Sequence, residues 1–332
     1  MKYHPVASPH THGGNSTTTI MYLVVAALLP TTFYGIYCYG FSAATTIIVA
    51  IAVALICEWV CLLLLNRKRH AVFDGSAILT ALLLALSLPP DSPVWLVAIG
   101  ATFAIVIGKQ VYGGLGQNLF NPAMLARVML LICFPIEMTD WTAIAAPQLV
   151  DGNLVFSQAW LGVDAISSAT PLASDSDPFT PMQLFNGYHA SSIGEGNSLL
   201  ILLGGLFLIG KGVIRYVLPL AVIAGVVIPA AVFHLIWPES YLSPLQHVFS
   251  GALMLTAFFI ATDMVTSPTS IKGQWVFGLG VGTITWLIRS FGNYPEGAAF
   301  AVLIMNSATP LIDHYLRPRI FGSEKPLLHR GG

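Results

Sequence analysis

The sequence predicts an all-α membrane protein of about ten transmembrane helices, arranged as two inverted five-helix repeats with a long periplasmic loop between them. Composition is the first reason. Of the 332 residues, 55% are hydrophobic and only 9% are charged, whereas soluble domains carry roughly 25% charged residues. The other two reasons are the recurrence of long apolar segments and a duplication between the halves of the chain. The net charge of −1 gives no indication of nucleic-acid binding.

The expected spans are apolar segments that mostly approach the roughly 20 residues needed to cross a bilayer. The first, 20–39, is too long for the apolar region of a signal peptide, so we interpret it as a retained membrane anchor. Two segments, 75–88 and 247–262, are short, and each is third in its group of five. The full set is 20–39, 43–66, 75–88, 93–109, 121–136, 197–210, 212–236, 247–262, 274–290 and 297–315.

A weak internal repeat supports the division into two groups of five. Residues 74–81 align with 250–257 at an offset of 176, and Gly116 and Gly292 are separated by the same offset. An odd number of spans per repeat makes the two copies inverted in the membrane. Short segments at matching positions of inverted repeats predict half-helices that line a central site. Tilted or peripheral helices are the alternative.

The distribution of Lys and Arg predicts the orientation, because cytoplasmic loops are enriched in them. With a cytoplasmic N-terminus, 12 of the 14 basic residues lie on the cytoplasmic side, and the stretch 137–196 contains seven carboxylates and no Lys or Arg. We therefore expect that stretch to be periplasmic. The predicted parts are a cytoplasmic N-terminal segment 1–19, a first repeat 20–136, a periplasmic loop 137–196, a second repeat 197–315 and a cytoplasmic tail 316–332.

The periplasmic loop contains a run of small residues, Asp164-Ala-Ile-Ser-Ser-Ala-Thr170, followed by Pro171. Proline restricts the residue before it to extended conformations, so the Thr170 hydroxyl is expected to be accessible. Small neighbours leave room for a bulky covalent group. Most runs of this composition are solvated turns, so the residues alone do not decide between a turn and a modification site.

The pattern Asp-x-x-Ser-Ser-Ala-Thr resembles the flavinylation motif of the family that contains the D subunit of the Rnf complex and the B subunit of the Na⁺-pumping NADH:quinone oxidoreductase (Nqr). The resemblance implies FMN bound covalently to Thr170 through a phosphoester, attached by a flavin transferase. Asp164, Ser167, Ser168 and Ala169 match the rest of the motif. The family often has Gly where this chain has Ser168, and both residues are small.

A second motif runs from Gly113 to Met124, with the sequence Gly-Gly-Leu-Gly-Gln-Asn-Leu-Phe-Asn-Pro-Ala-Met. Its glycines permit a tight turn, and Asn118 and Asn121 can both donate and accept hydrogen bonds. A structural turn is one interpretation. The resemblance implies another, a second, non-covalent flavin such as riboflavin near Asn118 and Asn121. Arg127, in the expected fifth span, would either contact that flavin or pair with a carboxylate.

The resemblance extends over nearly the whole chain and implies a membrane flavoprotein subunit of an ion-translocating electron-transport complex in the bacterial inner membrane. Its implied activity is electron transfer between ferredoxin and NAD⁺ coupled to Na⁺ or H⁺ movement. The implied partners are the G-type periplasmic flavoprotein, the A and E membrane subunits and the B and C subunits for electron input and output. The short segment before the first span favours the D subunit over the longer Nqr subunit.

Intramembrane charges are costly and so are candidate functional residues. Glu58 is expected in the middle of a span, where it could bind a cation, contact a partner subunit or be protonated. Asp74 and Asp263 lie at the ends of spans and would serve as caps. No catalytic residue and no metal cluster is recognisable in the sequence. Cys57 and Cys61, four residues apart, would share a helix face, and we expect them to be buried thiols rather than a ligand pair.

Two rival functions remain open from the sequence. A solute channel resembling urea transporters would have the same five-plus-five inverted plan, but it would not need the Ser-Ser-Ala-Thr run. A quinone-reducing subunit of the Nqr type shares the flavin motif, and quinone-dependent turnover would identify it.

Overall fold

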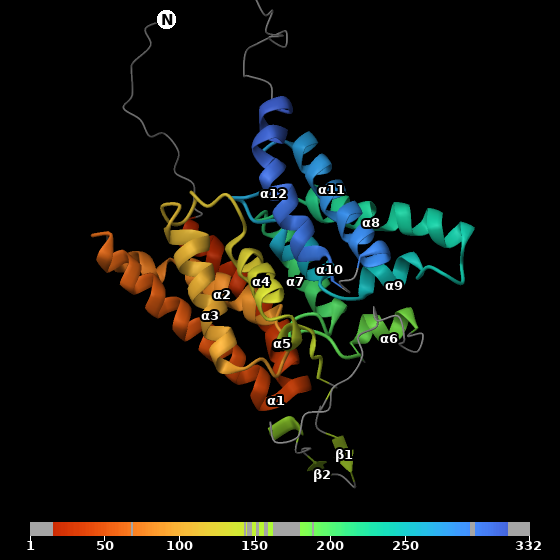
Figure 1. Ribbon diagram of the computed structural model, residues 1–332, viewed down its shortest axis with the longest axis horizontal. Helices are drawn as coiled ribbons and strands as arrows, with labels where there is room; N and C mark the ends of the chain where they lie inside the picture. The colour runs from red at the N-terminus through yellow and green to blue at the C-terminus, as the bar shows by residue number, and fades with distance from the viewer. Residues whose placement is uncertain are drawn as a thin grey trace, which may run out of the picture.

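The fold is mostly helical, as Figure 1 shows. The computed structural model describes residues 16–67, 69–142, 144, 148–150, 153–155, 159–161, 180–187, 189–292 and 296–317. Within these ranges the expected all-α fold has one exception. It is an antiparallel hairpin of β1 (Gln148–Val150) and β2 (Asn153–Val155), in the stretch predicted to be periplasmic.

Helix α1 (Thr17–Leu64) contains the first two expected spans as two arms of one element. Ser16 caps its start by accepting a hydrogen bond from the Thr19 N–H at 3.1 Å. The arms meet at Gly40, whose φ of 65° and ψ of −136° interrupt the helix and favour glycine. Trp160 packs against this turn, and its Nε1 donates to the Tyr37 carbonyl at 3.0 Å.

The first of the two short segments is a short helix, as predicted. Gly75, with φ +83°, precedes α2 (Ser76–Leu86), and the helix ends before Pro89-Pro90. Proline disfavours helical conformation in the residue before it, which explains the stop. The elements around α2 are η1 (Arg69–Asp74), α3 (Val94–Ile105) with its π-helical continuation η2 (Val106–Gln110), α4 (Pro122–Cys133) and α5 (Pro135–Thr139).

The second short segment, 247–262, was expected to be one helix, and the structure divides it. Ser243 begins α9 (Pro244–Phe249) with a capping box. Gly251, with φ +61°, then separates α9 from α10 (Leu253–Leu255), which continues into the π-helical η4 (Thr256–Ile260). The other elements of this half are α7 (Ser198–Gly210), α8 (Val217–Ile236), α11 (Ile271–Phe291) and α12 (Ala298–Tyr315), close to their expected bounds.

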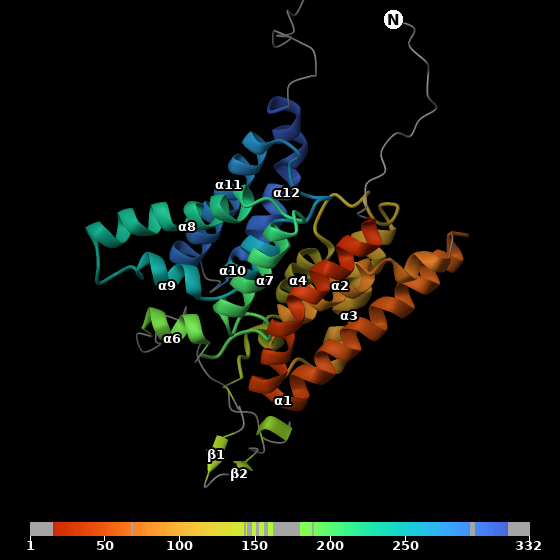
Figure 2. The ribbon, with the colours of Figure 1, turned by 180° about the vertical axis from the view of Figure 1, so that it is seen from behind.

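The helices form two groups that lie side by side (Figures 1 and 2). In the first group α1 packs against α2 and α3, and in the second α8 packs against α11. Helices α4 and α12 contact each other and join the groups. The β1–β2 hairpin and the C-terminal end of α12 lie at opposite ends of the molecule (Figures 1 and 2). Short elements η3 (Ala159–Leu161) and α6 (Pro181–Asn186) belong to the stretch with the hairpin.

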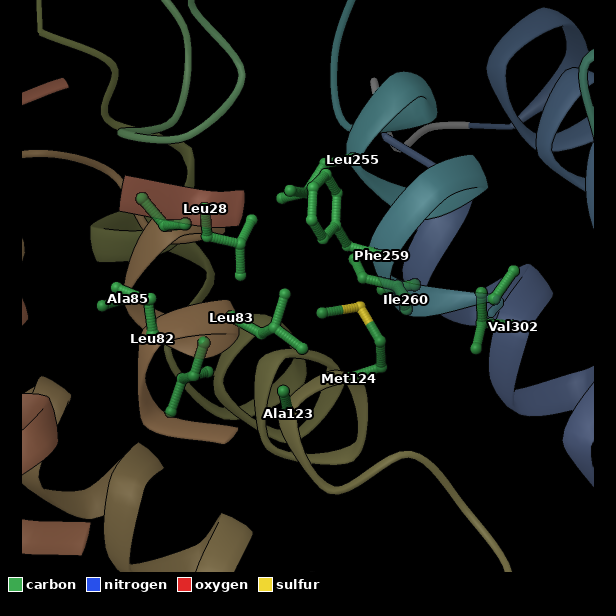
Figure 3. Packing of buried hydrophobic residues seen from close by; sticks show 14 of the residues in the cluster. Leu28, Leu82, Leu83, Ala85, Ala123, Met124, Leu255, Phe259, Ile260 and Val302 are labelled. Atoms are coloured by element: carbon green, nitrogen blue, oxygen red, sulfur yellow. The ribbon is translucent and has the colours of Figure 1, made fainter. Parts of the chain in front are cut away.

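The core lies where the short helices of the two groups meet. Figure 3 shows Leu83 of α2 and Met124 of α4 facing Phe259 and Ile260 of η4. All four side chains are buried. The short helices therefore occupy the middle of the molecule, where the sequence predicted a central site.

Two helices among the described residues, α1 and α8, are long and apolar enough to cross a membrane. Several other apolar helices, including α2, α4 and α7, are shorter. The ten-span inverted repeat and its orientation therefore stay predictions.

Candidate functional site

A cavity lies between the short helices, at the end of the molecule where α1 begins and α3 and α7 end. Its volume is about 90 Å³, and it opens to the surface. Its walls are mostly apolar, with a few polar side chains among them. This is the usual character of a small-molecule pocket. The polar residues that line it are Ser76, Thr80, Lys109, Asn118, Asn121, Thr262 and Asp263.

The structure brings two predicted site residues, Asn118 and Asn121, together on this cavity. Asn121 caps α4, because its Oδ1 accepts from the N–H groups of Ala123 at 3.1 Å and Met124 at 3.3 Å. The Asn118 amide donates to the Phe120 carbonyl at 3.1 Å. The loop before them turns tightly, with positive φ at Gly113, Gly114 and Gly116 as the sequence predicted.

A buried ionic group adjoins the cavity, which its members Lys109 and Ser76 line. Lys109 Nζ donates to both Glu58 carboxylate oxygens, at 2.7 and 2.8 Å, and to Ser76 Oγ at 2.6 Å. Gln110 Nε2 donates to the same glutamate at 3.1 Å. The side chains of Lys109 and Glu58 are each 2% exposed. The costly mid-span carboxylate predicted at Glu58 is therefore stabilised by a direct cation partner, which the sequence analysis did not identify.

Of the two aspartates expected to act as caps, only Asp74 bonds at a helix start, one residue before the N-cap of α2, whereas Asp263 stabilises the turn after η4. Asp74 Oδ1 accepts from the Ser76 N–H at 2.8 Å at the start of α2, and it also accepts from the Ser76 hydroxyl. Asp263 follows η4, where it accepts from the Val265 N–H and the Thr266 hydroxyl, both at 3.2 Å. Only Asp263 of the two lines the cavity.

Arg127, the third predicted residue near a flavin, lies elsewhere. It lines a second, smaller cavity and forms ion pairs with Glu195, at 3.4 Å, and with Glu296. The structure thus follows the alternative in which Arg127 pairs with carboxylates. Neither glutamate was singled out from the sequence, although a buried arginine in a span requires such a partner.

The flavinylation motif lies outside the described residues. Asp164, Ser167, Ser168, Ala169 and Thr170 all fall in the range 162–179, for which the structure describes nothing. Their assignment stays a prediction from the sequence.

Fold and site together define a class of protein, one built of apolar helices with a mostly apolar cavity between its short helices. The chain belongs to the NQR2, RnfD, RnfE family, whose model matches residues 5–322. This result confirms the resemblance stated from the motifs.

Curated relatives are similar over almost their whole length. The chain is 40% identical to the D subunit of the ion-translocating oxidoreductase complex of Halorhodospira halophila (strain DSM 244 / SL1), over 96% of this chain and 95% of the relative. It is 42% identical to the protein of the same description from Cronobacter sakazakii (strain ATCC BAA-894), over 97% and 99%. For the Stutzerimonas stutzeri protein the identity is 43%, over 95% of each chain.

Proposed function

We propose that this chain is the flavin-bearing D subunit of an ion-translocating oxidoreductase complex, and that it passes electrons through FMN joined to Thr170 by a phosphoester. The observation that carries the proposal is the near-complete match to relatives described as the D subunit of such a complex. The motif that ends at Thr170 lies inside the range matched by the family. The expected couple is ferredoxin and NAD⁺, linked to Na⁺ or H⁺ transport.

The proposal includes an arrangement in the bacterial inner membrane. Ten spans in two inverted repeats would put both termini in the cytoplasm and the Thr170 loop in the periplasm, where a flavin transferase and a G-type flavoprotein would meet it. The β1–β2 hairpin belongs to the proposed periplasmic loop, and α12 leads into the proposed cytoplasmic tail. The two lie at opposite ends of the molecule, which supports this orientation (Figure 1). The A, E, B and C subunits would supply the remaining redox and membrane parts.

The larger cavity is our candidate site for the second, non-covalent flavin. Its mostly apolar walls suit a planar ring, and the Asn118 carboxamide could donate to and accept from ring atoms. The Asn121 oxygen already accepts two N–H groups of α4, so Asn121 could only donate, through its remaining amide hydrogen. A flavin supplies one- and two-electron chemistry, and the protein supplies its position and electrostatic surroundings. The same two asparagines were named from the sequence for this role.

The covalent flavin is tested by replacing Thr170 with alanine. Wild-type chain expressed with a flavin transferase should give a fluorescent band after denaturing electrophoresis, and Thr170→Ala should give none, because the phosphoester needs the hydroxyl oxygen. Ser174→Ala, in the same stretch but outside the motif, is the control and should keep the fluorescence. A dark wild-type band would contradict the proposal and favour the solute-channel alternative.

The second flavin is tested by Asn118→Leu, which has nearly the same size but no hydrogen-bonding group. Loss of one ligand hydrogen bond should weaken binding by about tenfold, measured as flavin released from the purified complex on denaturation. Gln117→Leu removes a neighbouring carboxamide that is exposed and does not line the cavity, so it should release as much flavin as wild type. If Asn118→Leu released as much flavin as wild type, the result would argue against this cavity as the flavin site.

A further inference from the structure

Two buried carboxyl groups, Glu195 and Glu296, share Arg127 outside the candidate flavin cavity. Arg127 reaches Glu195 at 3.4 Å and also contacts Glu296. The side chains of Arg127 and Glu195 are 6% and 2% exposed, and that of Glu296 is 12% exposed. The two carboxyl groups lie at neighbouring nitrogens of one guanidinium group, Nη1 for Glu195 and Nη2 for Glu296. Since two buried carboxylates at one cation repel each other, the arrangement favours one proton on the pair.

The partners indicate which group is neutral. Glu296 contacts Arg127 closely, and its Oε1 accepts from the Ala252 N–H at 2.7 Å, at the start of α10. A helix start favours a negative charge. Glu195 has the longer, 3.4 Å contact to the same arginine, and its other stabilising side-chain partner is the neutral Ser192. An ionised, buried carboxylate needs more stabilisation than that, so the proton belongs on Glu195.

Other charged or titratable groups near the pair come from two more elements. Arg289 of α11 acts on both carboxyl groups through space, while its own N–H groups donate to the carbonyls of His247 at 2.7 Å and Ser250 at 2.9 Å. Tyr39 of α1 interacts electrostatically with Glu195. Burial, and then the charge of Glu296, raise the pKa of Glu195 to about 8, against the opposing effect of Arg127.

The pair has a route to water. Arg127 and Glu296 line the smaller cavity, which has room for a water molecule. Thr139, at the end of α5, lines the same cavity and is exposed. A proton on Glu195 therefore has a path to the surface through Glu296 and water.

The position of the pair connects it to both short helices. The segment that carries Glu195 is bonded to the C-terminal end of α2, since the Gly194 N–H donates to the Leu86 carbonyl at 2.7 Å and Ser192 Oγ to the same carbonyl at 3.0 Å. Glu296 is bonded to the start of α10 through Ala252. A change in the charge of Glu195 or Glu296 would therefore affect the hydrogen bonds at the C-terminal end of α2 and at the start of α10.

We propose that Glu195 and Glu296 form a proton-exchange site, in which Glu195 carries one proton that passes through Glu296 to water in the smaller cavity and returns by the same route. On release, the O–H bond of Glu195 breaks, an O–H bond forms on Glu296, and the proton then bonds to a water oxygen. No electron moves in this step. The site then holds two carboxylates beside Arg127, and their repulsion loosens the Glu195 segment from α2. The proposal does not depend on a flavin.

Infrared spectroscopy of the purified complex during a pH titration tests the proposal, because a protonated carboxyl group has its own C=O stretching band. A carboxylic acid band should be present at neutral pH and disappear as the pH rises through about 8. Glu195→Gln, which has the shape of the protonated side chain, should abolish that band. Glu239→Gln changes an exposed carboxylate between α8 and α9 and should leave the band intact.

Two further measurements keep the test decisive if Glu195→Gln does not assemble. Glutamate labelled with ¹³C in the side-chain carboxyl should shift the titrating band of the wild-type complex, and Glu195→Asp should move its midpoint. The proposal is wrong if no carboxylic acid band titrates in the wild type, if the label leaves the band in place, or if the band persists in Glu195→Gln.

Discussion

Replacement of Arg127 by methionine is expected to lower the free energy of unfolding by about 3–5 kcal/mol, the usual cost of removing one partner from a buried ion pair. Methionine has a similar length but no charge, so Glu195 and Glu296 would share their buried site without a direct cation partner. Total stabilities of single domains are only about 5–15 kcal/mol, so the loss should be large. Thermal unfolding of the detergent-purified protein measures it as a lower Tm.

Arg215→Met is the matched control for this prediction, because Arg215 is exposed in the loop between α7 and α8. It should leave the Tm close to that of wild type. Adding Glu296→Gln to Arg127→Met removes one uncompensated charge and should recover part of the lost stability. Equal melting of the Arg127 and Arg215 variants would mean that the buried network does not stabilise the fold.

The helices of this protein were largely predictable from the sequence because their signals are local. Apolar length and flanking residues predicted the helices from α7 to α12 nearly to their observed bounds, apart from the division of 247–262. Pro89 and Pro90 correctly ended α2, because proline restricts the residue before it. The break at Gly251 was missed, since a glycine inside an apolar run can be helical or, as here, adopt φ +61°.

The candidate site was only partly predictable, because its main contacts join residues far apart in the chain. The pair Glu58–Lys109 spans 51 positions, and Arg127–Glu296 spans 169. No periodicity or motif links such residues. Asn118 and Asn121 were predicted together because the motif that contains them is continuous in sequence, and both line the larger cavity. For Arg127 the sequence offered pairing with a carboxylate as one alternative, and the structure shows it without the sequence having identified the partners. For Glu58 the ion pair with Lys109 was not among the predicted alternatives.

Replacement of Gly282 by alanine is expected to lower the free energy of unfolding by about 1–3 kcal/mol, the usual cost of overpacking. Helices α8 and α11 lie close together at Gly225 and Gly282. A Cβ on Gly282 would lie 2.2 Å from the Val222 carbonyl oxygen, and one on Gly225 would lie 2.5 Å from the Leu279 oxygen. These neighbours are backbone atoms, so the helices must separate. The loss should appear as a lower Tm.

The opposite result is expected at Gly210, which provides the matched control. It is also helical, at the end of α7, but a Cβ there has no atom within 4 Å. Gly210→Ala should therefore leave stability unchanged or raise it by up to about 1 kcal/mol, the difference in helix propensity. If Gly282→Ala melted at the same temperature as Gly210→Ala, the close approach of α8 and α11 would not be a feature of the folded protein. If Gly282→Ala alone lowers the Tm, the two glycines Gly278 and Gly282 serve to pack α11 closely against α8. Small residues four positions apart commonly have this role between helices in membranes.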